Sequence, residues 1–360
     1  MKIALLGDIA LIGRFSQRSI LAKGYFSELI KLLAEVDIII GNLESPFVTD
    51  QQPYGAKSAH IGTQLDNIEI LKSLGVNFLN LANNHIFDFG RSSYELTKSL
   101  LDESGIGFFG TEEKNIIVEK SGEKLQLFGF CCYSTNPLCI GKHGVNKLNI
   151  NSVKSALKQA TQNKYLPILS IHTGEEHVNY PNVDYIKWAR ALSCNYNYIL
   201  YGHHPHVVQG WESVNRSLLL YSLGNFCFDD IYTSKSSKPL VKLSDNNKRG
   251  AIAIIEINKG AIVNYRILPI YMGQEQMTIS KNDDNPFKNF SDSLNFSDEL
   301  EYSSMRSNLI HEYISSRKSL RDFEWYIKRF NITSVKMILN AKRNAYLYKK
   351  NVKNILSSWA

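Results

Sequence analysis

Apolar runs and amphipathic stretches alternate along the first 110 residues of the chain. The short apolar runs predict buried strands at 1–7, 36–42, 76–83 and 106–110. Apolar residues at helical spacing predict helices at 25–36, 67–75 and 92–105. Strands that alternate with amphipathic helices are typical of a layered α/β fold, in which the helices pack on the faces of a sheet.

The second part of the chain is richer in strand patterns. A hairpin is predicted at 115–130, with its turn at Ser121 and Gly122. Further apolar runs predict strands at 166–172, 196–202, 217–226, 249–257 and 261–272. Helical spacing returns at 151–162 and 182–193. The main domain is therefore expected to be one α/β unit over residues 1–275.

The apolar periodicity is lost near residue 272. Residues 276–298 are polar and rich in Asn, Asp and Ser, which predicts a linker. Residues 299–360 regain helical spacing, with aromatic and aliphatic residues among lysines and arginines. We therefore expect a basic helical extension there.

The positive charge of the chain is concentrated in that extension. Residues 301–360 hold 12 Lys and Arg against 4 Asp and Glu, whereas residues 1–300 hold 29 and 30. A near-neutral main body argues against nucleic-acid binding, because such binding depends on neutralising phosphates.

Composition places the protein among ordinary globular chains. Of the 360 residues, 44% are hydrophobic and 21% are charged. The opening apolar run reaches Asp8 too soon for a signal sequence, and we expect no membrane span. Five cysteines without zinc-type spacing favour a reducing compartment. The expectation is a cytoplasmic protein that can sit at the inner face of the membrane.

Polar side chains follow the apolar runs at the predicted strand ends. They are Asp8, Glu44, Asn84, His172, His204 and Asn225. In α/β sheets, ligands bind in the crevice beyond the carboxyl ends of the strands. These residues therefore predict one shared site.

The residue types at the strand ends suit a metal site. Residues 200–210, LYGHHPHVVQG, add His206 to His204 at a spacing that Pro205 stiffens. Carboxylate, amide and imidazole ligands favour Mn²⁺, Fe or Zn²⁺. Asp8, Glu44, Asn84, His172, His204 and His206 are the predicted ligands of two divalent ions, with Glu44 as the bridge because its two oxygens can face two ions.

Other residues have candidate roles around these ligands. We expect His85 to donate a proton to a leaving group, oriented by Asp88, and His203 to support the ligands. Glu175 is a solvated loop charge, or it orients a ligand histidine or touches substrate. Asn225 satisfies a buried turn or lines the substrate side.

Basic residues in two loops are candidates for binding an anionic substrate. Residues 231–250 are either a mobile lid or a plain surface loop, and Arg249 at their end could hold a carboxylate or phosphate. Lys57, in the loop at 45–60, has a similar candidate role.

Six motifs in order carry a resemblance to a known family. They are GDI, GNLESP, LANNHIFDFG, HTGEEH, GHHPHVVQG and YSLGNFCFD, and the resemblance covers about residues 1–270. The chain resembles the CapA family of bacterial poly-gamma-glutamate capsule synthesis proteins, which shares the calcineurin-like metallophosphoesterase architecture.

The resemblance implies a fold and a ligand assignment. The fold would be a four-layer αββα sandwich of the metallo-dependent phosphatase type. One metal would be held by Asp8, Glu44 and His206, and the other by Glu44, Asn84, His172 and His204. His85 would take the place of the phosphoesterase proton donor. Metallophosphoesterases usually open with D-x-H, but here Ala10 stands two residues after Asp8 in place of the histidine, which implies a weaker first metal site.

Two functions of different classes follow. The first is a metal-dependent hydrolase or transferase in capsule or surface-polymer biosynthesis, acting on a phosphoester or a poly-gamma-glutamate-like anionic polymer. The alternative is a non-catalytic polymer-binding or export-assembly component of a capsule machinery. The basic extension either packs on the main domain or docks on an anionic membrane or on that machinery.

Overall fold

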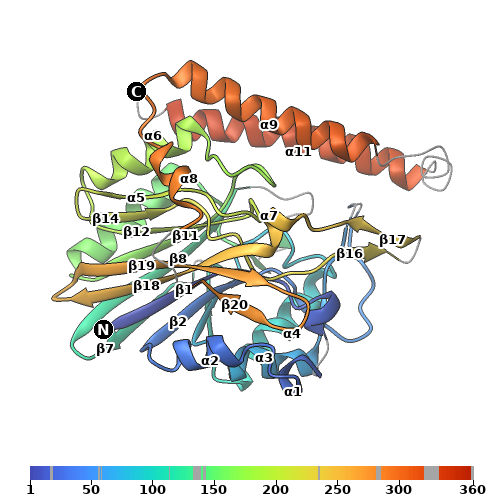
Figure 1. Cartoon of the computed structure of the whole chain (residues 1–360), viewed down its shortest axis with the longest axis horizontal. Coiled ribbons are helices and arrows are strands. Elements are labelled where there is room, and N and C mark those ends of the chain that lie inside the picture. The colour runs from blue at the N-terminus through green and yellow to red at the C-terminus, as the bar shows by residue number, and fades with distance from the viewer. Residues whose placement is uncertain are drawn as a thin grey trace.

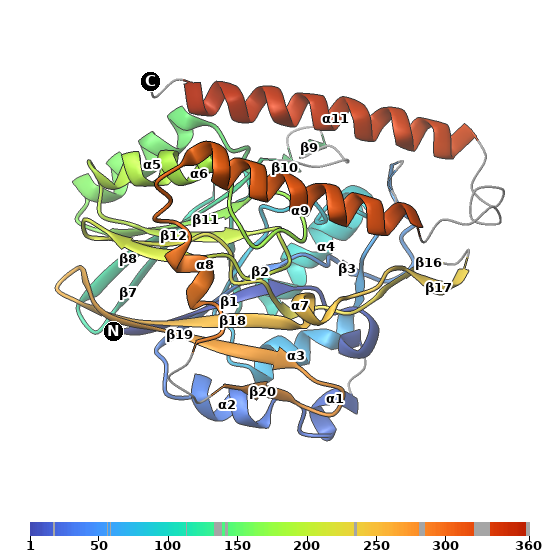
Figure 2. The same cartoon turned by 45° about the horizontal axis from the view of Figure 1, so that its top comes forward.

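Two β-sheets packed face to face form the centre of the protein (Figures 1 and 2). A computed structural model describes residues 1–16, 19–55, 57, 59–112, 114–132, 139–140, 143–233, 236–280, 285–319 and 332–357. The larger sheet consists, in order, of β20 (Met277–Ile279), β19 (Ala261–Met272), β18 (Arg249–Asn258), β1 (Lys2–Ile9), β2 (Ile38–Leu43), β5 (Phe78–Asn80) and β6 (Gly107–Phe109). A further strand, β15 (Asn225–Cys227), pairs with the end of β1.

The smaller sheet contains most of the strands predicted from the middle of the chain. Its order is β13 (Trp211–Val214), β14 (Ser217–Leu220), β12 (Ile199–His203), β11 (Leu166–His172), β8 (Glu123–Cys131) and β7 (Ile116–Lys120). Strands β8, β11, β12 and β14 run parallel to one another. The hairpin of β7 and β8 turns at Ser121 and Gly122, as predicted, and both residues have positive φ.

Helices cover the outer face of each sheet. The larger sheet is covered by α2 (Ser27–Leu33), α3 (Ile68–Ser73) and α4 (Gly90–Glu103). The smaller sheet is covered by α5 (Ile150–Gln162) and α6 (Val183–Ser193). Figure 2 shows helices, sheet, sheet and helices in succession. The predicted four-layer αββα sandwich is confirmed.

Period-two alternation explains why the strands are apolar throughout. In β1, Ile3 and Leu5 pack between the sheets, whereas Ala4 and Leu6 pack against the helices on the other side. Successive side chains of a strand point to opposite faces, so a strand covered on both sides needs apolar residues at every position. This is why the pattern predicted buried strands and not half-exposed ones.

Shorter elements connect these layers. The short strands are β3 (Phe47–Val48), β4 (Thr63–Gln64), β9 (Cys139–Ile140), β10 (His143–Gly144), β16 (Ile231–Thr233) and β17 (Ser236–Val241). The short helices are η1 (Gly13–Ser16), α1 (Ser19–Ala22), η2 (Leu65–Asn67), α7 (Asp245–Lys248) and α8 (Lys288–Asp292). The loop at 231–250 thus contains β16 and β17, which pair with each other, followed by α7.

The single strand predicted at 217–226 is wrong. The structure divides this run into β14, in the smaller sheet, and β15, which pairs with β1 in the larger sheet. Gly224, with a φ of 67°, allows the chain to turn from one sheet to the other. The apolar pattern is continuous because both pieces are buried.

The segment predicted as a linker contains regular structure. Strand β20 pairs with β19, and α8 brings buried Phe287 and Leu294 against the sandwich. In the extension, the described parts are two long helices, α9 (Glu299–Ser319) and α11 (Ile332–Ser357), and both contact α6. Residues 320–331 of the predicted helical extension lie outside the described residues.

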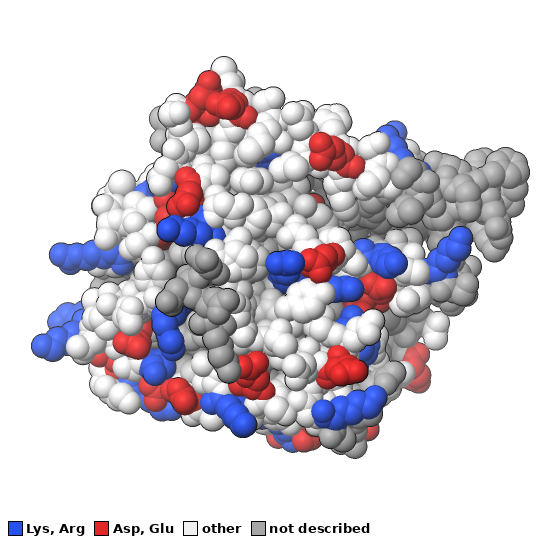
Figure 3. Space-filling model, viewed as in Figure 1, with Lys and Arg blue, Asp and Glu red and all other residues white. Residues whose placement is uncertain are grey.

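Within the described part of the chain, no helix combines the length and the apolar character needed to cross a bilayer. On the face shown in Figure 3, lysines and arginines are interspersed with acidic residues. The charge of that face of the main body is therefore mixed.

Candidate metal centre

The carboxyl ends of strands from both sheets bring the predicted ligands together. Asp8 lies in β1 and Glu44 follows β2, whereas His172 ends β11. Ligand atoms of these three buried residues lie within 4.8 Å of one another. The larger sheet therefore supplies carboxylates and the smaller sheet supplies imidazoles to one site.

Asp8 is held as a carboxylate by several donors. Its Oδ1 lies 2.9 Å from His203 Nδ1 and accepts from Asn42 Nδ2 at 2.9 Å, and its Oδ2 accepts from the backbone N–H of His204. Burial would raise the pKa of Asp8, but the hydrogen bond and charge of His203 outweigh it and lower the pKa. Asp8 is therefore ionised at neutral pH.

Glu44 is the most unusual group of the site. It is fully buried, and neither carboxylate oxygen has a hydrogen-bond partner among the described residues. Burial, followed by the negative charge of Asp8, raises the pKa of Glu44 well above its ordinary value. Buried carboxylates ordinarily have hydrogen-bond partners or cations, so this side chain fits a cation that would contact both oxygens.

Imidazoles surround the Glu44 carboxylate on two sides. On one side, His172 Nδ1 lies 3.6 Å from Glu44 Oε1, and His172 Nε2 lies 2.9 Å from Asn84 Oδ1 and 3.1 Å from His204 Nδ1. On the other side, His206 Nε2 lies 3.9 Å from Glu44 Oε2. Burial lowers the pKa of His172 well below its ordinary value and that of His204 to about 4, so both rings are neutral near pH 7.

Asn225 lies next to His206 in this site. Its Oδ1 lies 2.9 Å from His206 Nδ1, and its Nδ2 donates to the carbonyl of Asn247. The amide oxygen can only accept, so Nδ1 of His206 carries the proton and Nε2 is left as the ligand atom. Asn225 contacts a predicted ligand here.

The backbone of the histidine loop adopts conformations that are rare for residues with a side chain. His204 has a φ of 97° and His206 a φ of 56°. Such conformations cost of order 1–3 kcal/mol each and occur most often at functional sites. The His204–Pro205–His206 turn is therefore held by its surroundings.

His85 and Asp88 form a second buried group beside Asn84. His85 Nδ1 lies 2.7 Å from Asp88 Oδ2, and Lys57 Nζ lies 2.7 Å from Asp88 Oδ1. Burial opposes the charge of Asp88, but Lys57 outweighs it and lowers the pKa of Asp88 to about 2. Burial, with the charge of Lys57, also lowers the pKa of His85. A 2.7 Å contact with a carboxylate requires the proton on Nδ1, so Nε2 of His85 is the nitrogen that can exchange a proton.

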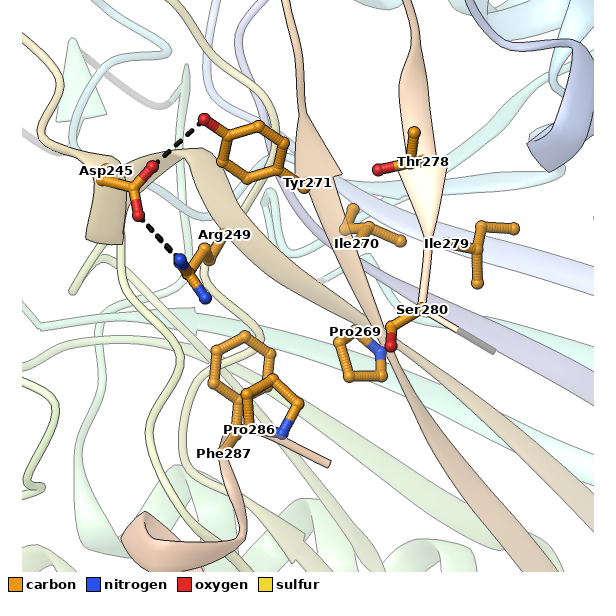
Figure 4. A pocket seen from close by; sticks show the side chains of 10 residues that line it. All are labelled: Asp245, Arg249, Pro269, Ile270, Tyr271, Thr278, Ile279, Ser280, Pro286 and Phe287. Atoms are coloured by element: carbon orange, nitrogen blue, oxygen red, sulfur yellow. Dashed lines mark hydrogen bonds and ion pairs between the residues drawn. The ribbon is translucent and has the colours of Figure 1, made fainter. Parts of the chain in front are cut away.

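Two other residues predicted to bind substrate, Glu175 and Arg249, form ion pairs with side chains outside the group of candidate ligands. Glu175 forms an ion pair with Arg306 of α9. Arg249 forms an exposed pair with Asp245 at 2.8 Å. Figure 4 shows Arg249 beside a cavity of about 370 Å³, where Tyr271 donates to the same Asp245 carboxylate.

Sequence reasoning missed two asparagines that support Asp8. Asn80 Nδ2 donates to Asn42 Oδ1, and Asn42 in turn donates to Asp8. Both lie at the ends of the buried strands β2 and β5, where an amide interrupts an apolar run. An amide within an apolar run is the sequence feature that could have indicated these two residues, because a buried amide requires hydrogen-bond partners.

Fold and site define an α/β sandwich protein with a candidate metal centre at the carboxyl ends of its strands. The chain belongs to the family described as "Bacterial capsule synthesis protein PGA_cap", whose model matches residues 2–230. The predicted family is confirmed.

Two relatives and one solved structure show what the chain is similar to. The PGA biosynthesis protein CapA of Bacillus subtilis (strain 168) is 30% identical over 256 residues, which are 67% of this chain and 67% of that protein. The capsule biosynthesis protein CapA of Bacillus anthracis is 28% identical over 68% of this chain and 64% of its own length. The sulfate thiohydrolase SoxB of Thermus thermophilus matches 76% of this chain and 46% of its own, with 12% identity and a TM-score of 0.42.

Proposed function

We propose that this protein is a metal-dependent hydrolase or transferase acting on a phosphoester, or on an anionic poly-gamma-glutamate-like polymer, in capsule biosynthesis. The observation that carries the proposal is the buried Glu44 carboxylate between histidines on two sides, without a hydrogen-bond partner among the described residues. Family membership supports the biological setting.

The contacts support two neighbouring ligand groups that share Glu44. His206 Nε2 lies 3.9 Å from Glu44 Oε2, and an oxygen of Asp8 lies within 4.8 Å of a Glu44 oxygen, which fits one cation. Asn84 Oδ1 and His204 Nδ1 both lie near His172 Nε2, while Nδ1 of the same ring faces Glu44 Oε1, and these four residues are the donors that we assign to a second cation. Bound Mn²⁺, Fe or Zn²⁺ would polarise a substrate oxygen and lower the pKa of a bound water.

The chain itself supplies proton exchange through His85. With Nδ1 held by Asp88, the ring is neutral near pH 7 because burial and the charge of Lys57 lower its pKa. An anionic substrate would raise that pKa, because a nearby negative charge favours the protonated ring. His85 would thus take up a proton with the substrate and then donate it to the leaving group.

The test combines metal content with hydrolysis. Purified protein dialysed against Mn²⁺ or Zn²⁺ should retain metal by elemental analysis and hydrolyse members of a phosphoester and poly-glutamate panel. His204→Ala should lose both properties, whereas His85→Ala should keep the metal and lose turnover, because His85 is not among the proposed ligands. His311→Ala, at an exposed position on α9, is the matched control. Wild-type protein without bound metal would contradict the proposal.

The composition of α11 favours the second candidate, a docking component. Helix α11 contains six Lys and Arg and no Asp or Glu. Its apolar side chains at Ile332, Val335, Leu339 and Tyr346 are exposed. Cationic helices with exposed apolar side chains bind anionic membrane surfaces. We therefore also propose that α11 docks the protein on an anionic bilayer.

A truncation separates the two candidates. Protein ending at Ser319 should keep its metal content but lose binding to vesicles that contain phosphatidylglycerol. Vesicles of phosphatidylcholine alone should bind neither form, and high salt should weaken binding of the full chain, because it screens exposed charges. If capsule formation depends on α11 and is unaffected by Glu44→Ala, the protein acts as an assembly component and not as an enzyme.

A further inference from the structure

One face of α9 contacts the loop that follows β11. The contacting residues are Tyr302, Arg306 and Tyr313, which recur at helical spacing. Tyr302 Oη donates to the carbonyl of Pro181 at 3.1 Å, and the Tyr313 ring lies 4.5 Å from the His177 ring. Figures 1 and 2 show α9 running from α6 towards the end of the molecule where β16 and β17 lie.

Arg306 makes the central contacts of this face. It is only 7% exposed, although most positions of α9 are exposed. Its Nε donates to the carbonyl of Tyr180 at 3.0 Å, and its Nη2 pairs with the Glu175 carboxylate. One guanidinium therefore ties the two ends of the segment 175–180 together.

The same segment is hydrogen-bonded to the histidine loop at 203–209. The backbone N–H of His177 donates to the carbonyl of Pro205 at 2.7 Å, and Gln209 Nε2 donates to the carbonyl of Val178. Asn179 Nδ2 donates to the carbonyl of Val208 at 2.8 Å. The conformation of the His204–Pro205–His206 turn thus depends on where residues 175–180 lie.

Asn247 adds a link from outside both loops. Its Nδ2 lies 2.7 Å from His177 Nδ1 and donates to the carbonyl of His206 at 3.0 Å. His177 itself has a positive φ of 65°. Contacts from three segments thus hold a backbone that a free loop would rarely adopt.

We propose that α9 clamps residues 173–182 onto the histidine loop, and that Arg306 is a positioning residue for the metal centre. This inference rests on the proposed metal-dependent function. It assigns α9, which lies beyond the part of the chain that matches the family, to the site itself. Residues that orient metal ligands from outside typically change metal affinity about 10- to 100-fold when they are lost.

The experiment compares three variants of the full chain by two measurements. Arg306→Ala removes both contacts, and Arg306→Lys keeps the charge but cannot reproduce the paired geometry. Lys187→Ala is the matched control, because it breaks an exposed ion pair between α6 and the first turn of α9, away from the loop. The measurements are Mn²⁺ affinity by titration calorimetry and hydrogen exchange of the metal-free protein.

Arg306→Ala should weaken Mn²⁺ binding at least about tenfold. It should also accelerate exchange in peptides covering 174–182 and 203–209. Arg306→Lys should fall between Arg306→Ala and wild type, and Lys187→Ala should match wild type.

Unchanged exchange in both peptides overturns the clamp, whatever the metal affinity. Faster exchange with unchanged Mn²⁺ affinity overturns the positioning role. If the wild-type chain binds neither Mn²⁺ nor Zn²⁺, the proposed function fails and the positioning role fails with it, whereas the exchange result still decides whether α9 holds the loop.

Discussion

Glu44 shows how burial and charge combine at one residue. Its carboxylate lies near that of Asp8, yet the two differ in their partners. Asp8 accepts hydrogen bonds from Asn42 and from the backbone of His204, whereas Glu44 has no such partner among the described residues. The pKa of Asp8 is therefore lowered, whereas that of Glu44 is raised.

The substitution Glu44→Gln should separate metal binding from folding. The amide has the same shape but no charge, so Mn²⁺ affinity should fall by more than about 100-fold. Loss of a residue that only orients a metal ligand typically costs about 10- to 100-fold. The metal-free protein should be as stable as wild type or more stable, because burying the Glu44 carboxyl requires it to take up a proton near neutral pH, and the glutamine avoids that cost. Calorimetry and chemical denaturation measure the two quantities. A variant that is much less stable without metal would show that Glu44 has a structural role.

The raised pKa of Glu44 makes metal binding depend on pH. A divalent cation must displace the proton that the buried carboxyl keeps, so affinity should increase as pH rises. His172 and His204 should contribute little to this dependence above pH 6, because their lowered pKa values leave them neutral. Mn²⁺ titrations between pH 6 and 8 test this, and Glu44→Gln should flatten the dependence.

Histidine burial should destabilise the metal-free protein in acid. The folded pKa of His204, about 4, lies below its ordinary value of 6.5, so the unfolded chain takes up a proton first as pH falls. The contribution of neutral His204 to the free energy of unfolding is fully present above pH 6.5 and is lost as the pH falls towards 4. The loss should be about 2 kcal/mol between pH 7 and pH 5. Denaturation of His204→Gln, which cannot titrate there, should show a smaller loss over the same range.

Part of the candidate site could be predicted from sequence because polar side chains that follow apolar runs come together at the carboxyl ends of the strands. Asp8, Glu44 and His172 do so. The pair of Arg249 with Asp245, four residues earlier, is local, whereas the partner of Glu175 could not be predicted because it depends on α9 packing beside the sandwich. No periodicity in a sequence indicates which distant helix meets a loop.

At the scale of elements, strand β12 delivers the histidine loop through a very close backbone approach. A Cβ added at Gly202 would lie 1.9 Å from the carbonyl oxygen of Tyr221. Gly202 precedes His203 and His204 directly, so the glycine determines where those side chains can lie. The close approach of Gly202 to the Tyr221 backbone therefore helps to position the histidine loop.

Gly202→Ala should displace β12 and weaken both folding and metal binding. We expect a loss of stability above about 3 kcal/mol, in the range of severe overpacking, because backbone cannot move aside cheaply. Gly122→Ala is the comparison: no heavy atom lies within 4 Å of its added Cβ, and only its φ of 79° is unfavourable. That change should cost about 1 kcal/mol. Equal losses in urea denaturation would show that β12 tolerates the shift.

The elements themselves were largely predictable. Helices α5 and α6 begin at Asn149 and Asn182, whose side chains cap the first backbone N–H groups. The crossing of the chain from the smaller to the larger sheet at Gly224 was not predictable, because an apolar pattern shows that a strand is buried but does not show to which sheet it belongs. Likewise, the polar composition of 276–298 concealed β20 and α8.

At the scale of the whole molecule, the two sheets are joined mainly by the apolar layer between them, and the candidate ligands extend that junction to its edge. Tyr201 of β12 adds a hydrogen bond from its Oη to the carbonyl of Leu6 in β1. Cations that Glu44 shares with Asp8 and with His172 would tie the same two sheets together.

Saturating Mn²⁺ should therefore stabilise the sandwich as one unit. At a hundred times the dissociation constant, binding adds about 2.7 kcal/mol to the free energy of unfolding. Differential scanning calorimetry should show a single transition that moves upward with Mn²⁺, and Glu44→Gln should show no shift. Separate transitions for the two sheets would contradict this coupling.

The division of ligands between the sheets also sets an order of events during protein synthesis. Asp8 and Glu44 emerge from the ribosome early, while His204 and His206 are still to be made. The nascent acidic pair must therefore exist without its imidazoles until β12 and the histidine loop have been made. Binding of the proposed cations would thus be a late step of maturation, and ribosome-bound chains that end before β12 should fail to retain Mn²⁺.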